Sequence, residues 1–237
     1  MVLLGTLVNT VAIIIGSLIG ISFNKIPDKV KTTVTHSMGL AVAILGVQMG
    51  FKSQHTLLMI GSLALGCVIG EWLDLEEKLN KLGLWIEVKF SRISKGKKGS
   101  IAQGFVTATL VFVVGAMGIV GALDSGLSGD HRVLFTKAML DGFFSLIFAT
   151  QLGIGVIFSA IPVFLYEGII ALAATFIVHF IPVPVMKELL NEITGVGGVM
   201  ILAIGLNMLN LTKIKTANML PGIVICVMLV LLTQLIH

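Results

Sequence analysis

The chain has 237 residues, of which 56% are hydrophobic and 12% are charged, about half the charged share of a soluble domain. Its mean hydropathy is +1.05, and its apolar residues fall in blocks of about 17 to 25, the length that a helix needs to cross the hydrocarbon layer of a membrane. This composition excludes a soluble globular domain. It predicts an all-α fold, a polytopic transmembrane helical bundle in the lipid bilayer.

Eight membrane segments are predicted in chain order, over residues 4–22, 37–52, 56–72, 103–122, 134–157, 159–181, 195–211 and 217–236. The first block lacks the basic region and the cleavage site of a signal peptide, so we expect it to remain as a span. The apolar run 134–181 contains Gly153, Gly155 and Pro162, and it fits either two helices or one broken helix.

One long polar stretch, residues 74–104, separates the third segment from the fourth. Its first half has leucines and an isoleucine at near-helical spacing, which predicts an interfacial helix. Its second half is a basic loop with Lys89, Arg92, Lys95, Lys97 and Lys98. A basic cluster beside a membrane segment is typical of a topology signal that touches anionic lipid, so nucleic acid is not an expected partner.

The basic residues also predict the orientation of the chain. Placing the 74–104 loop in the cytoplasm leaves only Lys52, Arg132, Lys137 and Lys187 outside, and the other basic residues inside. Because successive spans alternate in direction, both termini are then extracytoplasmic.

An internal repeat is predicted from two similar stretches. Residues 39–49 match residues 198–208 at a fixed offset, which places Gln48 opposite Asn207 and Cys67 opposite Cys226. Segments 1–3 (residues 1–72) then correspond to segments 6–8 (residues 159–237), with an inserted helix pair at 105–157. Since segments 1 and 6 run in opposite directions, this is an inverted-topology repeat, the usual build of secondary transporters.

Acidic residues inside apolar segments require an explanation, because a carboxylate at a helix centre costs about 2.5–3.5 kcal/mol on insertion scales. Asp141 and Glu167 lie in such segments, and Asp124 lies at the end of another. Lys137 precedes Asp141 by one helical turn, so the two are expected to share a helix face and to pair. The pair either only lowers the cost of burial, or Asp141 binds a cation or proton and Lys137 acts as its gate or as an anion contact. Glu167 either belongs to this pathway or is hydrated near the cytoplasmic interface.

Neutral polar residues also occur in apolar surroundings, namely Asn9, Gln48, Gln151 and Asn207. They either join neighbouring helices or coordinate a solute through their amide oxygens. The histidines and cysteines lack metal-site spacing, and no Gly-x-Ser-x-Gly elbow occurs, so we expect neither an enzyme nor a metal or cofactor. Glycines at every third position from Gly115 to Gly121 predict a smooth helix face with a flexible end after it.

Several of these stretches resemble one protein family. Gly5–Asn9, Gly115–Gly126, Gly129–His131 and Thr136–Gly142 resemble the YqgA/YdfK-like bacterial membrane proteins, a family classed as a domain of unknown function. The resemblance implies a multi-pass protein of the bacterial cytoplasmic membrane, often described as a candidate transporter. It supplies no substrate and no site residues.

The leading functional hypothesis is a secondary transporter for a small solute or ion. The alternatives are an ion channel, or a membrane scaffold or sensor that acts through the 74–104 loop. Glycine-rich helix faces favour a homodimer.

Overall fold

A computed structural model describes residues 1–22, 28–90, 100–181 and 183–236. These residues form helices and no strand, as the apolar pattern predicted. The chain divides into two compact units, each assembled from separate stretches of sequence. The basic residues Arg92, Lys95, Lys97 and Lys98 of the predicted loop lie outside the described residues.

Unit 1 comprises Met1–Lys31, Leu79–Val113 and Met117–Ile177. Its elements are α1 (Leu4–Ser22), most of α4 (Leu75–Phe90), α5 (Ser100–Val113), α6 (Ala116–Leu127), α7 (Arg132–Leu152), the 3₁₀ helix η1 (Gly153–Ser159) and α8 (Ala160–Phe180). Unit 2 comprises Thr32–Lys78, Val114–Ala116 and Val178–His237. Its elements are α2 (Asp28–Gly50), α3 (Thr56–Leu73), the start of α4, α9 (Val183–Met208), η2 (Thr216–Met219) and α10 (Pro221–Ile236).

Helices that are long and apolar enough to cross a membrane occur in both units. Six helical stretches in the described residues are long and apolar enough to cross a membrane, and one of them, 132–177, is 46 residues long. The pair α5 and α6 qualifies as a seventh, bent by 63° at its break. Each of the eight predicted segments overlaps one of these helices or the bent pair.

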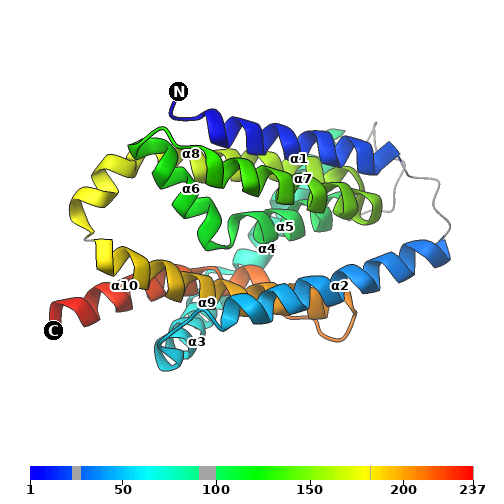
Figure 1. Cartoon of the computed structure of the whole chain (residues 1–237). Coiled ribbons are helices and arrows are strands. Elements are labelled where there is room, and N and C mark those ends of the chain that lie inside the picture. Colours follow the sequence, from blue (N-terminus) through cyan, green and yellow to red (C-terminus); the bar gives the residue numbers. More distant parts are fainter. Residues whose placement is uncertain (23–27, 91–99, 182, 237) are drawn as a thin grey trace. The chain divides into compact units, whose positions relative to one another are not determined.

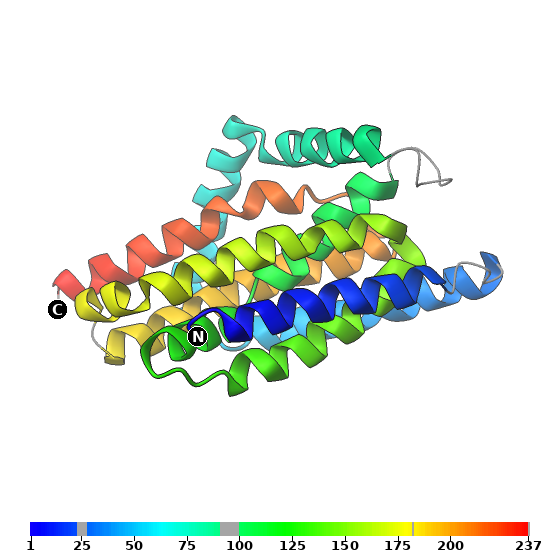
Figure 2. The ribbon, with the colours of Figure 1, turned by 90° about the horizontal axis from the view of Figure 1, so that it is seen from above.

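The helices α1 and α7 pack closely and run in the same direction, side by side in both views (Figure 1, Figure 2). Gly5 of α1 lies against Leu134, near the start of α7, and Gly20 lies against Ala149, near its end. Between them, a Cβ on Gly16 would overlap the carbonyl oxygen of Gly142. Glycine is required at this position because only a bare Cα lets the two backbones approach so closely.

The chain reverses direction between α7 and α8. Gly121 of α6 contacts Leu134, and the Ser125 hydroxyl lies 2.9 Å from the His131 ring, so α6 and α7 form an antiparallel hairpin. Gly118 and Gly126 of α6 contact successive turns of α8, so these two helices are parallel. The run 134–181 therefore forms two helices joined by η1, the first of the two predicted alternatives. It also follows that α1, which is parallel to α7, is antiparallel to α8.

The break between α5 and α6 lies at Gly115, whose φ of +140° is open to glycine but strained for other residues. The sequence predicted a smooth helix face that begins at Gly115 and ends in a flexible segment after Gly121. The structure instead has the break at Gly115, and α6 begins after it. The reason is the backbone conformation of Gly115, which glycine spacing does not reveal. The break frees backbone groups that an unbroken helix would pair.

In unit 2, α2 and α9 cross with a reciprocal pattern of glycine contacts. A Cβ on Gly46 would lie 2.7 Å from the Gly198 carbonyl oxygen, and a Cβ on Gly198 would lie 2.7 Å from the Gly46 carbonyl oxygen. Gly39 and Gly205 face each other in the same way, at 3.1 and 2.8 Å. The later glycine of α2 thus contacts the earlier glycine of α9, so the two helices are antiparallel. The helices α3 and α10 are antiparallel too, since Gly66 lies on Gly222 of α10 and Gly70 lies on Asn218 of η2, just before α10.

The helix α4 confirms the helical half of the predicted 74–104 stretch. Its exposed surface includes Trp85, which is 58% exposed and has the Lys89 ammonium 4.9 Å from its ring centroid. Tryptophan is enriched at membrane–water interfaces, so an exposed Trp85 agrees with the interfacial position predicted for α4. That position stays a prediction.

Close backbone packing makes a testable difference between two glycines. We expect Gly16→Ala to destabilise the protein by about 1–3 kcal/mol, because its methyl group would overlap backbone atoms that cannot move aside easily. Gly61→Ala is the matched control, since a Cβ there meets nothing within 4 Å. Thermal unfolding of the purified variants in detergent checks this, and equal melting temperatures for the two would contradict the packing described here.

Candidate functional site

Four buried polar side chains from three helices of unit 1 meet in one place, which we call the polar cluster. They are Asn9 on α1, Lys137 and Asp141 on α7, and Glu167 on α8. Asn9 and Glu167 are 0% exposed, while Lys137 and Asp141 are 6% and 7% exposed. Glu167 is therefore buried rather than hydrated at an interface.

The cation of the cluster is Lys137. Its ammonium forms an ion pair with Asp141 Oδ2, as the spacing of one helical turn predicted. The same nitrogen lies 3.4 Å from Glu167 Oε1 and donates a hydrogen bond of 2.9 Å to the carbonyl oxygen of Phe112. One ammonium thus joins both carboxylates to the end of α5.

The Phe112 carbonyl is available because the helix breaks after α5. In an unbroken helix this oxygen would accept the N–H four residues later, beyond Gly115. Here the chain bends by 63°, and the oxygen accepts a hydrogen bond from the Lys137 ammonium instead. The break therefore contributes a backbone ligand to the cluster.

Asn9 connects the two carboxylates from the side of α1. Its Nδ2 donates to Asp141 Oδ2 at 3.0 Å and to Glu167 Oε1 at 2.8 Å. The amide therefore uses both of its protons on carboxylate oxygens.

The cluster is not electrically balanced. With both carboxyl groups ionised it holds two negative charges and one positive charge, which leaves an excess of one negative charge. In addition, Asn9 Oδ1 and Glu167 Oε2 are buried and have no hydrogen-bond partner among the described residues. Both of these atoms are acceptors, so what the cluster lacks is a positive charge and a donor.

Comparison with known proteins places this chain in a family. Residues 4–231 match the family described as protein of unknown function DUF554. The chain belongs to this family. It is 37% identical to the uncharacterized membrane protein YdfK of Bacillus subtilis (strain 168), with 93% of each chain covered. It is 29% identical to the uncharacterized protein YqgA of Escherichia coli (strain K12), with 94% of each covered. No solved structure matches the chain.

The remaining predicted site residues of this DUF554 member lie outside the polar cluster. Gln48 is exposed on α2, and Asn207 binds the turn after α9, where its amide contacts Thr212 and the backbone of Ile214. Gln151, near the end of α7, donates to Thr150 at 3.3 Å. Asp124 is half-buried on α6. Their predicted role in a pathway receives no support from these positions.

Sequence reasoning missed Glu192, a fully buried acid on α9. Its carboxylate accepts hydrogen bonds from the Ser53 hydroxyl at 2.6 Å and from the backbone N–H groups of Gln54 and His55 at 2.7 and 3.1 Å. These donors precede α3, so Glu192 holds the entry to that helix in place. Glu192 lies one helical turn before the apolar block that begins at residue 195, which could have indicated burial. The polar residues around it suggested a loop instead.

Charges outside the spans behave differently from those of the cluster. Asp130, in the turn before α7, is bound by the Arg132 guanidinium, with Nε 3.0 Å from each carboxylate oxygen. This contact lowers the pKa of Asp130 to about 2. An exposed pair of this kind explains the turn and needs no functional reading.

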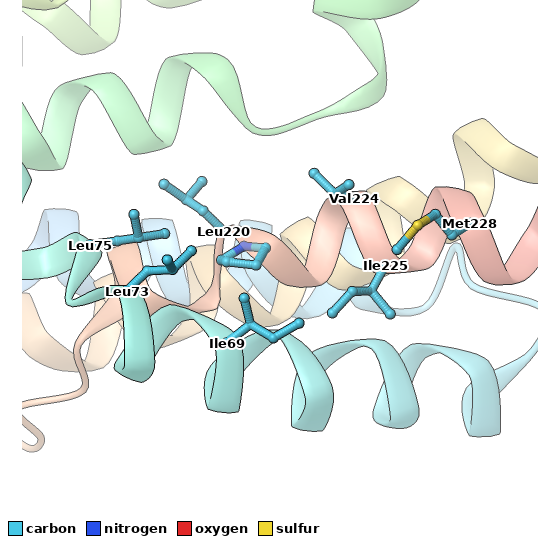
Figure 3. A pocket seen from close by; sticks show the side chains of 8 residues that line it. Ile69, Leu73, Leu75, Leu220, Val224, Ile225 and Met228 are labelled. Atoms are coloured by element: carbon cyan, nitrogen blue, oxygen red, sulfur yellow. The ribbon is translucent and has the colours of Figure 1, made fainter.

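An open groove of about 390 Å³ lies in unit 2, between α3, the start of α4 and α10 (Figure 3). The side chains that line it are all apolar, namely Ile69, Leu73, Leu75, Leu220, Pro221, Val224, Ile225 and Met228. Without a polar side chain to orient a solute, this groove is a poor candidate for a binding site. The polar cluster is the stronger candidate.

Proposed function

We propose that this protein is a secondary transporter that moves a small solute or ion across the bacterial cytoplasmic membrane, with the polar cluster as its ion site. The observation that carries the proposal is the excess carboxylate of the cluster. A structural ion pair needs only Lys137 and Asp141, and even a buried pair is often no more stable than apolar residues of similar volume. Adding Glu167 to the pair increases the cost of burial, which favours a functional reason for its presence.

The broken helix gives further support. Transporters commonly build their sites from discontinuous helices whose freed backbone groups face the substrate or the coupling ion. The α5–α6 break supplies the Phe112 carbonyl to Lys137 in this manner. The glycine next to the cluster, Gly118, leaves room there, since a Cβ on it would lie 3.4 Å from Lys137 Cε and 3.8 Å from Glu167 Oε1.

An inverted repeat with eight spans is part of the proposal. Within unit 1, the direction of α1 opposes that of α8, as expected for the first helices of two inverted copies. Within unit 2, Gly39 corresponds to Gly198 in the repeat, and Gly46 corresponds to Gly205. The contact of Gly39 with Gly205 therefore has the contact of Gly198 with Gly46 as its equivalent, and both contacts are present. Reciprocal contacts of this kind are typical of a two-fold axis between equivalent elements.

The proposed orientation has the first connection, the 74–104 loop and the last connection in the cytoplasm, and both termini outside. We expect reporter fusions after Lys31, Lys98, Arg132 and Lys215 to report inside, inside, outside and inside. The reason is the concentration of Lys and Arg in the connections assigned to the cytoplasm. An outside signal after Lys98 would contradict the orientation, and equal signals after Lys98 and Arg132 would contradict the odd number of spans between them.

Transport itself is tested with purified protein in proteoliposomes. We expect one class in a panel of small anions, cations and neutral solutes to produce saturable charge or proton movement, and Asp141→Asn to reduce it at least tenfold. The substitution removes the partner of Lys137, so the ammonium and Glu167 form a neutral pair and the excess charge disappears. Asp130→Asn, an exposed acid outside the cluster, is the matched control and should keep the activity.

Three results would count against this reading. Unchanged movement in Asp141→Asn would remove the site assignment. Conduction that does not saturate would favour a channel. A correctly inserted protein that moves no solute, and whose cellular role is lost when residues 91–99 are deleted, would favour a scaffold.

A further inference from the structure

The donors of the polar cluster are all in use, and its unpartnered atoms are all acceptors. The Lys137 ammonium has three neighbours that accept, and the Asn9 amide has two. Glu167 Oε2 and Asn9 Oδ1 remain without a partner, and both residues are 0% exposed. These two atoms belong to groups that already touch, because Asn9 Nδ2 lies 2.8 Å from Glu167 Oε1.

We propose that Glu167 carries a proton on Oε2 and donates a hydrogen bond through it to Asn9 Oδ1, while Asp141 stays ionised against Lys137. The two groups then pair as a carboxylic acid and an amide, each donating one hydrogen bond and accepting one. A single proton fills both unpartnered acceptors and removes the excess negative charge. If the protein is the proposed transporter, this proton is its coupling ion, taken up from water on one side and released to water on the other.

The contacts assign the proton to Glu167 rather than to Asp141. Asp141 Oδ2 accepts from both the Lys137 ammonium and the Asn9 amide, and both donors stabilise a charged carboxylate. Glu167 has the longer contact to Lys137, 3.4 Å, and one oxygen without a donor. Burying a charge without enough partners costs several kcal/mol, so the carboxyl group with fewer donors is the one that becomes neutral.

The groups that face Glu167 from each neighbouring helix are few. They are Asn9 on α1, Gly118 on α6, Lys137 and Asp141 on α7, and Tyr166 beside it on α8. The phenol of Tyr166 is neutral at physiological pH, so Lys137 and Asp141 supply the charges that set the protonation of Glu167. The number of bound protons should therefore equal the number of carboxyl groups minus the number of cations.

An alkali cation is the other way to balance the charge. Such an ion must exchange its hydration shell for several oxygen ligands. The cluster offers two unpartnered oxygens, with the Thr6 hydroxyl, one turn away on α1, as a third buried group without a partner. A proton satisfies the same atoms with no further ligand, so the geometry favours it.

Infrared spectroscopy of the protein in an ester-free detergent such as dodecyl maltoside, at neutral pH, tests the assignment through the C=O stretch of a protonated carboxyl group, which neither a carboxylate nor the detergent gives. We expect a wild-type band that is lost in Glu167→Gln, which keeps the shape of the acid without its proton. We also expect loss in Asp141→Asn, because Glu167 then ionises to balance Lys137. In Lys137→Met two carboxyl groups lack a cation, and the band should have about twice the wild-type area.

Glu192→Gln is the matched control. Glu192 is equally buried, but its carboxylate accepts hydrogen bonds from three donors and should give no such band, so this variant should keep the wild-type spectrum. If Lys137→Met does not fold, Glu167→Gln and Asp141→Asn still test the rule, provided that size-exclusion profiles confirm their folding.

Two results would overturn the proposal. One is a wild-type spectrum without the band, and the other is a band that persists in Glu167→Gln. Thermal stabilisation of the wild type by Na⁺ or K⁺, but not by choline, together with a missing band, would assign the site to an alkali cation instead. The spectra are recorded without solute or transport, so the two proposals can fail separately. A band in a protein that transports nothing rejects only the proposed function. Transport by a protein without the band rejects only the proposed proton on Glu167.

Discussion

Hydrocarbon cannot hydrate a polar group, and this constraint governs the structure around the polar cluster. Two carboxyl groups, one ammonium and one amide lie where they are 7% exposed or less, so their partners must come from the protein. Asn9, the Phe112 carbonyl and the i, i+4 pair of α7 supply those partners from separate helices. The same constraint gives meaning to the atoms that lack partners, because they mark where an additional proton or ion completes the network.

Close helix packing is what lets such short side chains meet. The backbones of α1 and α7 approach at Gly16 and Gly142, and this contact brings Asn9 within hydrogen-bond distance of Asp141. Gly118 brings α6 close to Lys137 and Glu167. Small residues are the general means of helix association in lipid, where no hydrophobic effect drives helices together. The high glycine content of the sequence therefore serves both packing and the site.

Features within one helix could be predicted from the sequence, whereas contacts between distant helices could not. The spans follow from apolar block length, and the Lys137–Asp141 pair follows from a spacing of one turn. The meeting of Asn9 with Glu167, 158 residues apart, depends on which helices pack together and at which height. Glu192 was missed for a related reason, because its donors at residues 53–55 are 137 to 139 residues away in the sequence. Asn207 looked like a site residue because it lies opposite Gln48 in the repeat, yet its amide is used by its own turn.

The central claim is that the polar cluster lies on a pathway that opens to water. A single cysteine at position 118 tests it most directly, in a chain whose own Cys67 and Cys226 are replaced by alanine, because a side chain there faces Lys137 and Glu167. Membrane-impermeant thiol reagents are applied to oriented vesicles from one side and then from the other. Alternating access predicts slow labelling from both sides. Labelling from neither side, in a protein that is folded and inserted, would identify the cluster as a sealed structural element and contradict the account.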